Sequence, residues 1–326
     1  MLRFVLIIVL ILAGGNLGIA PSLTAEANWP ARPLHMIVPL PPGSAADVIA
    51  RVLGDRLGAR LGQPIIIENR AGASGTLGTL AIAKADPDGY TLGIATSTTL
   101  TTAPLLDAKL PYDPVKGFAS ITMIGVSPYV LVVNPKVPAK TVADVIALAK
   151  PTPKSLSYSS VGNASLAHLA GELFASRAGI ELNHVPYKSS THAVIDLLEG
   201  RIDMQFGILG TSLQFIRDDK LRAIASTTEQ RLEELPEVPT MIEAGLPGYE
   251  VSLLFGVIAP SAVPPTIVVR LNHDLGDILA MDEVKRVFAA QAIYAHSSTP
   301  DELRERIARE TEQWREVAAK AGIRPD

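Results

Sequence analysis

Two polar segments hold the side chains that could bind or transform a small molecule. In the first, Ser44 and Asp47 follow a Pro-Pro-Gly stretch and precede an apolar pattern with helical spacing. The second, residues 159–168, is rich in serine and also leads into a helical pattern. The first turn of a helix has free N–H groups and the positive end of the helix dipole, so it binds anions well. Ser-x-x-Asp is also a variant of the capping box, and Ser44 and Asp47 could therefore serve only to cap their own helix.

Motifs of common catalytic and cofactor sites are missing from the sequence. There is no phosphate-binding P-loop, and Gly72, Gly75 and Gly78 do not have the spacing of a dinucleotide fingerprint. Ser74 and Ser165 lack the glycines that flank a hydrolase nucleophile. The six histidines have no metal-ligand spacing, and the chain has no cysteine. We therefore predict a binding protein with no catalysis, no cofactor and no metal.

Alternating strand and helix patterns must position the two polar segments. An apolar run at 34–38 predicts a strand that ends just before the first segment. Further strands are expected at 63–69 and 90–95, separated by helical patterns, which is typical of a doubly wound parallel sheet. Open α/β sheets bind ligands beyond the carboxyl ends of their strands. The two polar segments and Thr96-Ser97 are therefore the candidate binding loops. The second half of the chain repeats the layout, with strands expected at 155–160, 184–187, 202–206 and 221–226.

Two segments are expected to cross between two lobes. Strands at 121–125 and 130–133, interrupted at Ser127-Pro128, predict the first crossing, and an apolar strand at 251–260 predicts the second. Helices are expected at 266–279 and 300–319, and the latter could pack on the second lobe. The expected organisation is a signal peptide, a first lobe, a second lobe and a return to the first lobe, at residues 1–27, 28–127, 128–250 and 251–326.

The composition excludes several classes of protein. The chain has 326 residues, of which 48% are hydrophobic and 19% are charged, so it can bury a large core and is not disordered. Aromatic residues make up only 5%, the net charge is −4, and no basic cluster is present. Nucleic acid is therefore not an expected partner.

The first 27 residues have the features of a secretory signal. Arg3 supplies the positive charge, residues 4–13 are apolar, and Ala25-x-Ala27 fits a cleavage site. The alternative is a retained membrane anchor, which needs roughly 20 apolar residues. Asn16 interrupts the apolar run. We expect cleavage after Ala27 and export to the periplasm.

Short motifs spread over the remaining chain carry a resemblance to one family. On the basis of these motifs, the chain resembles the Bug family, the periplasmic substrate-binding receptors of tripartite tricarboxylate transporters. The resemblance covers nearly all of the chain beyond the signal. The motifs include Trp29-Pro30-x-Arg32-Pro33, Pro39-x-Pro41-Pro42-Gly43-x-x-x-Asp47, Glu68-Asn69-Arg70-x-Gly72, Pro87-Asp88-Gly89-Tyr90, His168-Leu169-Ala170-Gly171-Glu172 and Leu235-Pro236-x-Val238-Pro239-Thr240.

The resemblance implies an α/β protein of the two-lobed periplasmic binding type (type II, Venus-flytrap), each lobe a doubly wound sheet flanked by helices. It implies a monomer that captures a small carboxylate between the lobes and delivers it to a two-component integral membrane transporter. The first strand–helix loop of each lobe is expected to grip a ligand carboxylate. The candidate ligand-binding residues are Pro41, Gly43, Ser44, Ala45, Asp47, Thr96, Ser97, Ser159, Ser160, Gly162, Asn163, Ala164, Ser165, His168 and Asp203.

The chain departs from the residues usual in the family at Leu40, Ser44, Ser189 and Gly207. These departures could change which ligand is chosen. Two alternatives to a transport receptor stay open. The first is a receptor of the same fold that serves a membrane kinase as a sensor, which only its partner would distinguish. The second is a secreted α/β hydrolase, which would need a nucleophile with a base.

Overall fold

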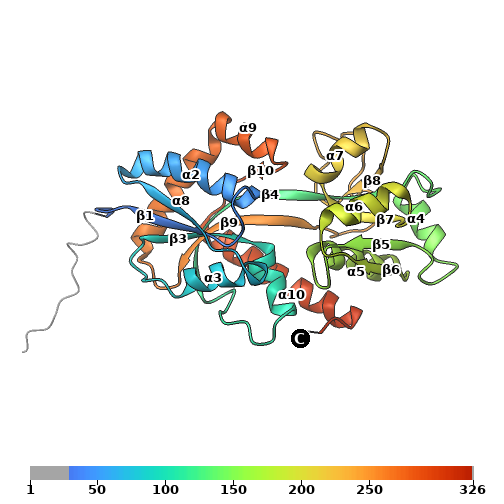
Figure 1. The fold of residues 1–326 in the computed structure, drawn as a ribbon, viewed down its shortest axis with the longest axis horizontal. Helices are drawn as coiled ribbons and strands as arrows, with labels where there is room; N and C mark the ends of the chain where they lie inside the picture. Colours follow the sequence, from blue (N-terminus) through green and yellow to red (C-terminus); the bar gives the residue numbers. More distant parts are fainter. Residues whose placement is uncertain (1–28, 325–326) are drawn as a thin grey trace, which may run out of the picture.

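The described part of the protein, residues 29–324 of a computed structural model, forms two α/β lobes. The predicted signal peptide, residues 1–27, lies outside these residues. Two long strands, β4 (Phe118–Val133) and β9 (Ser252–Pro260), connect the lobes (Figure 1). The predicted two-lobed α/β fold is therefore confirmed. Within residues 29–324, no helix combines the length and the apolar character that a membrane span requires.

The first lobe is built on a mixed sheet with the strand order β2-β1-β3-β9-β4. Strand β1 (Leu34–Val38) pairs in parallel with β2 (Ile65–Asn69) and β3 (Thr91–Thr96), whereas β9 is antiparallel to β3 and β4. Four of the five residues of β1 are buried, as expected for a central strand covered on both faces. The short strand β10 (Tyr294–Ala295) pairs with β4.

The second lobe repeats this plan with the strand order β6-β5-β7-β4, and β8 pairs with β4. Strand β5 (Ser157–Ser160) is parallel to β6 (Asn183–Pro186) and to β7 (Met204–Ile208). Strands β7 and β8 (Arg222–Ser226) are antiparallel to β4.

The first crossing is one strand of 16 residues, and the predicted interruption at Ser127-Pro128 is wrong. Pro128 is the last residue of β4 that is paired with β9, opposite Ser252, and Tyr129 is the first that is paired with β7. A proline removes one donor from a sheet ladder. Here it stands where the strand changes partners, so the strand continues through it. The second crossing, β9, agrees with the expected segment at 251–260 within one residue.

Helices cover both faces of each sheet. In the first lobe, α2 (Ala45–Leu61), α8 (Pro265–Ala280) and α9 (Asp282–Ala290) pack on one face, and α3 (Thr76–Ala83) packs on the other. In the second lobe, α4 (Val142–Ala149) and α5 (Leu166–Ala178) cover one face, and α6 (Ser190–Glu199) and α7 (Leu209–Arg217) cover the other. Three short helical turns, at Ala73–Gly75, Thr98–Thr102 and Ala103–Leu105, belong to the loops of the first lobe.

The last helix, α10 (Pro300–Ala321), packs on both lobes (Figure 1). It begins with a capping box formed by Thr299 and Glu302. Near its start, Leu303 belongs to a core cluster of the first lobe. Near its end, Trp314 and Val317 belong to the main core of the second lobe. The helix therefore joins two hydrophobic cores that β4 and β9 already connect.

Three elements, α7, α9 and β10, have no counterpart among the sequence predictions. No side chain caps α7 or α9, so neither helix has the usual signal at its start. Only Met281 separates α9 from α8. On one side of the molecule, two of these elements bring the lobes into contact. The Tyr294 hydroxyl of β10 donates to the carboxylate of Glu234, and a Cβ on Gly210 of α7 would lie 2.9 Å from the methyl group of Ala292.

The strand register shows which edge of each sheet faces the other lobe. The carboxyl end of β3 pairs with the part of β9 nearest the crossing, and β1 and β2 run parallel to β3. In the second lobe, the carboxyl end of β7 pairs with Tyr129 beside the crossing, and β5 and β6 run parallel to β7. The loops that follow β1 and β5 therefore face each other from opposite lobes.

Candidate functional site

The loop between β1 and α2 ends in a capped helix N-terminus. Ser44 is the N-cap, and its hydroxyl accepts from the Asp47 amide at 3.3 Å. Gly43 has a φ of 80°, a left-handed conformation that favours glycine. Pro41 and Gly43 are exposed. The loop therefore presents its backbone to solvent at the edge that faces the second lobe.

Asp47 is buried, and its carboxylate accepts only from groups of its own lobe. The donors are the amide of Gly43 at 2.9 Å, the side-chain amide of Asn69 at 3.0 Å and the guanidinium of Arg51 at 3.1 Å. The hydrogen bond from Arg51 holds the pKa of Asp47 below its ordinary value. Asn69 also donates to the carbonyl of Leu40. These contacts favour a positioning role for Asp47, which holds the loop in shape from behind.

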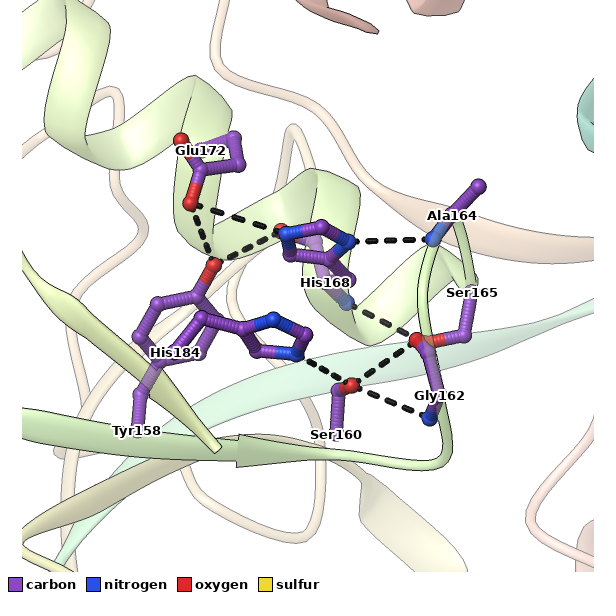
Figure 2. Close-up of polar contacts among 8 residues, drawn as sticks. All are labelled: Tyr158, Ser160, Gly162, Ala164, Ser165, His168, Glu172 and His184. Carbon is purple, nitrogen blue, oxygen red and sulfur yellow. Dashed lines mark hydrogen bonds and ion pairs between the residues drawn. The ribbon is translucent and has the colours of Figure 1, made fainter. Parts of the chain in front are cut away.

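The matching loop of the second lobe joins β5 to α5 (Figure 2). Ser165 is the N-cap of α5, where its hydroxyl accepts from the His168 amide at 3.4 Å. The same hydroxyl donates to the Gly162 carbonyl at 2.7 Å. The Ser160 hydroxyl accepts from the Gly162 amide at 3.1 Å. These bonds close the loop on itself, so its shape does not depend on a ligand.

Two stacked histidines support this loop (Figure 2). The rings of His168 and His184 lie 3.7 Å apart between centroids. The Nδ1 atom of His168 accepts from the Ala164 amide at 3.0 Å, which places the proton of the neutral ring on Nε2. Burial lowers the pKa of both histidines to about 4, and for His168 the neighbouring His184 adds to the effect. Both rings are therefore neutral near pH 7.

Behind His168, the phenol of Tyr158 donates to Glu172 at 2.6 Å. Burial, followed by the effect of the Glu172 carboxylate, raises the pKa of Tyr158. The ring nitrogen Nε2 of His168 lies 3.7 Å from the same carboxylate. A cavity of about 570 Å³ opens beside His168 and His184, between α5, β6 and the end of α10. It lies on the flank of the second lobe, away from the first lobe's loop.

Ser160 and His184 have the spacing of a nucleophile and its base, with 2.6 Å between Oγ and Nε2. The surroundings do not fit that role. Ser160 is fully buried, and its hydroxyl is also bonded within its own loop. The nearby carboxylate of Glu172 contacts His168 and Tyr158 instead of His184. The arrangement fits a structural hydrogen bond better than a catalytic pair.

The two helix N-termini offer the same kind of donor. The amide groups of Ala45 and Ala46 in α2, and of Leu166 and Ala167 in α5, have no acceptor within residues 29–324. First-turn amides of this kind carry the partial positive charge of the helix and bind oxyanions. The arrangement can therefore hold a carboxylate between the lobes by backbone groups.

Several candidate residues lie elsewhere or face away. The Ser97 hydroxyl donates to Glu310 of α10 at 3.2 Å and accepts from the Leu254 amide at 3.0 Å, so it belongs to the crossing. Thr96 is buried beside it, with its amide bonded to Thr99. Asn163 is exposed in the β5–α5 loop, and the Ser159 hydroxyl is buried without a hydrogen-bond partner in the described chain.

Asp203 does not share a site with the binding loops. Its carboxylate accepts from the amide and the hydroxyl of Ser157, at 2.7 and 2.6 Å. Ser157 begins β5, whereas the binding loop follows the other end of that strand. The structure therefore places Asp203 at the opposite edge of the sheet, where it ties β5 to the segment before β7.

His184 and the Arg306–Glu310 pair were not among the expected site residues. His184 lies in a short strand, and only the packing of β6 on β5 brings its ring onto His168. Arg306 contacts Glu310 at 2.8 Å and Glu250 at 3.1 Å. Burial raises the pKa of Glu310 in spite of this cation. The i,i+4 spacing of Arg306 and Glu310 was the available signal, but such pairs are common on exposed helices.

Two opposed lobes with capped helix N-termini at their facing edges define a class, the two-lobed solute-binding receptors. Within residues 29–324, no group of three or more His, Asp or Glu side chains is arranged to hold a metal ion. The family model described as "Tripartite tricarboxylate transporter family receptor" matches residues 49–323. The chain belongs to this family of receptors.

Similar proteins agree with this assignment. Protein BugT of Bordetella pertussis (strain Tohama I) is 40% identical over 308 residues, covering 94% of this chain and 94% of its own. Among solved structures, R. palustris Rpa4515 with adipate is 34% identical with a TM-score of 0.76, covering 91% of this chain and all of its own. MatC from Rhodopseudomonas palustris with bound malate is 28% identical with a TM-score of 0.71, covering 89% of this chain and 99% of its own.

Proposed function

We propose that this protein captures a small carboxylate between its lobes and delivers it to a tripartite tricarboxylate-type membrane transporter. The observation that carries the proposal is the pair of opposed helix N-termini, α2 and α5, with free first-turn amides. The ligands named for two similar structures, adipate and malate, are both carboxylates, which supports the substrate class. Membership of a receptor family supports a binding role without catalysis.

Because the two loops contain no cationic side chain, micromolar binding of a carboxylate requires groups from both lobes. Residues 39–47 and 159–168 contain no lysine or arginine. Micromolar affinity corresponds to about 8 kcal/mol, and one hydrogen bond to a charged group contributes about 1.5–3 kcal/mol. One helix dipole adds at most about 2 kcal/mol. Several such bonds, from α2 and α5 together, are therefore required, and the ligand favours approach of the lobes.

In this proposal, the free amides of Ala45 and Ala46 and the Ser44 hydroxyl contact one oxygen of the ligand, and Pro41 and Gly43 shape the exposed loop before them. The free amides of Leu166 and Ala167, with the exposed side chain of Asn163, contact the other, and Gly162, Ala164 and Ser165 give the loop its shape. Asp47 and His168 hold the two loops in shape from behind. The receptor acts as a monomer, because each copy carries both halves of the site.

The test is titration calorimetry of the purified protein against a panel of small carboxylates, with and without EDTA. We expect at least one carboxylate to bind with micromolar or tighter affinity, and EDTA to leave that affinity unchanged. Native mass spectrometry of freshly purified protein would identify a ligand that co-purifies. A panel without any binding, or binding that the chelator abolishes, contradicts the proposal.

The proposal includes export and cleavage after Ala27. The Ala25-x-Ala27 pattern precedes Asn28 and motivates this boundary. N-terminal sequencing of protein from the periplasmic fraction is expected to begin at Asn28. Periplasmic protein that begins at Met1 would show that the segment is retained.

A further inference from the structure

The cavity beside His168 is separate from the space between the lobes. It has a volume of about 570 Å³, and its lining residues lie within 154–184 and 317–321. It therefore belongs to the second lobe and to the end of α10, and the first lobe's loop takes no part in it. Sites for small molecules typically have volumes of about 300–1,000 Å³. The cavity is large enough for a ligand of its own.

A buried N–H donor without an acceptor lines this cavity. His168 is 6% exposed, and its Nδ1 atom accepts from the Ala164 amide, so the ring proton is on Nε2 (Figure 2). The Glu172 carboxylate lies 3.7 Å from Nε2, which is too long for a hydrogen bond. Within residues 29–324, the ring N–H therefore has no hydrogen-bond acceptor.

The carboxylate beside this donor is only partly used. Glu172 lines the same cavity, and its Oε1 atom accepts from the Tyr158 hydroxyl at 2.6 Å. Its Oε2 atom has no donor in the described part of the chain. The ring and the carboxylate do not belong to a group of three or more side chains that could hold a metal ion there. A molecule that donates to Glu172 and accepts from His168 would satisfy both groups.

The rest of the inner wall is apolar. Its side chains are buried, and they are Ala175, Ile180, Leu182 and Val317. The charged residues of the rim are exposed, and they are Lys154, Glu181 and Lys320. A ligand that fills the cavity therefore needs one end with both a donor and an acceptor, and an apolar remainder.

An α-amino acid with an aliphatic side chain has this distribution of groups. Its ammonium group can donate to Glu172, and its carboxylate can accept from the ring N–H of His168. Hydrogen bonds to charged groups of this kind are the stronger ones. A carboxylic acid without the ammonium group would be repelled by Glu172. An amine without the carboxylate would leave the ring N–H without an acceptor.

We propose that this cavity binds an aliphatic α-amino acid, and that the bound molecule raises the affinity of the protein for the carboxylate held between the lobes. His168 connects the two sites, because its other ring nitrogen accepts from Ala164 in the β5–α5 loop. A bond to Nε2–H favours the tautomer that holds this loop in shape. Such coupling is reciprocal. The coupling rests on the proposed function, whereas the site itself does not.

The experiment uses leucine and two analogues that each lack one charged group. Isocaproate lacks the ammonium group, and isopentylamine lacks the carboxylate. Each is titrated by calorimetry into the mature protein saturated with malate or adipate, whichever binds, or into the protein alone if neither does. Saturation keeps the probes out of the space between the lobes. We expect leucine to bind with submillimolar affinity and each analogue to bind at least tenfold more weakly.

Three variants test the residues of the cavity. Glu172→Gln should weaken leucine binding at least tenfold, because the amide keeps an acceptor for Tyr158 but loses the charge. Glu181→Gln is the matched control, a carboxylate on the exposed rim of the same cavity, and should change leucine affinity less than twofold. Ser176→Trp, at another exposed rim position, should block leucine and leave carboxylate affinity without leucine unchanged.

The coupling is measured by repeating the carboxylate titration in saturating leucine. The carboxylate should bind at least threefold more tightly to the unmodified protein, and equally tightly with and without leucine to Ser176→Trp. Absence of leucine binding means that the cavity holds only water and overturns the site. Equal binding of the analogues, or unchanged leucine affinity in Glu172→Gln, also overturns it. A carboxylate affinity that leucine does not change overturns the coupling alone. If no carboxylate binds, the proposed function and the coupling fall, and the leucine titration still decides the site.

Discussion

At the scale of single residues, the side chains that hold the two binding loops are, apart from Ser44, distinct from the groups proposed to touch the ligand. Ser44 and Ser165 use their hydroxyls to cap α2 and α5. Asp47 and His168 bond to amides of the loops, at Gly43 and Ala164. The groups left free to contact a ligand are, apart from the Ser44 hydroxyl and the Asn163 side chain, backbone N–H groups. Substitution of these four side chains should therefore act on loop shape before it acts on ligand contact.

Asp47→Asn tests this positioning role. We expect a loss of about 1.5–3 kcal/mol in the free energy of unfolding, because the bonds to a charged acceptor weaken, and a lower affinity for the carboxylate. The pKa of Asp47 is lowered in the fold, so its contribution is present above about pH 4 and is lost as the pH falls further. Urea unfolding from pH 3 to 7 should show the two proteins converging at the acid end.

Asp301→Asn is the control for this experiment. Asp301 is an exposed carboxylate in the first turn of α10. Its substitution should change the unfolding midpoint little across the same range. If Asp47→Asn retains both stability and affinity, the carboxylate does not hold the loop.

The stacked histidines predict a second pH dependence. His168 and His184 stay neutral in the fold down to about pH 4, whereas in the unfolded chain they take up protons below about pH 6.5. The unfolded state binds more protons in this window, so stability falls as the pH is lowered from about 6.5 to 4. His184→Gln should reduce the slope of the unfolding midpoint against pH. His273→Gln, at an exposed position of α8, should leave the slope unchanged.

How far the sequence predicts the site follows from these residues. Both capped N-termini were predictable, because Ser44 with Asp47, and Ser165 before a helical pattern, are local signals. The contact of His184 with His168 could not be predicted, since it depends on the register of β6 against β5. Asp203 was expected near the binding loops, but it lies at the opposite edge of the sheet, beside the start of β5. The edge at which such a residue lies depends on the direction of the strands, which the sequence alone does not give.

At the scale of elements, α10 contributes buried side chains to the cores of both lobes. Trp314 is 2% exposed in the core of the second lobe. Trp314→Ala should cost about 3–5 kcal/mol in the free energy of unfolding, because a large cavity remains. Urea denaturation followed by circular dichroism measures the loss. Arg315→Ala, at the exposed neighbouring position, is the control and should cost far less. A small loss at Trp314 would mean that the end of α10 is not part of that core.

Most elements followed from local patterns, and the exceptions have physical causes. Strand β4 was divided at Ser127-Pro128 because a proline usually ends a strand. The exchange of partners that tolerates it is a tertiary feature. Helix α7 lacks a side-chain cap, so no local signal marks its start.

At the scale of the whole molecule, the proposed function predicts closure. The two loops come from different lobes, and the free amides of either one supply too few bonds for micromolar affinity. Ligand must therefore favour the conformation in which both loops contact it. Small-angle scattering should show a smaller radius of gyration on saturation with a bound carboxylate. A small acid without measurable binding serves as the control. An unchanged radius on saturation would indicate a rigid site.

The position of α10 has a consequence for how the chain acquires its structure during synthesis. The second lobe is formed mostly by residues 129–251, yet Trp314 and Val317 of its core follow β9, α8 and α9 in the chain. The sheet of the first lobe is also incomplete until β9 has been made, because β9 lies between β3 and β4. Neither core can be completed before these later segments have been made. Each lobe is therefore completed by segments that are made after most of its other residues, so both cores stay incomplete for part of synthesis.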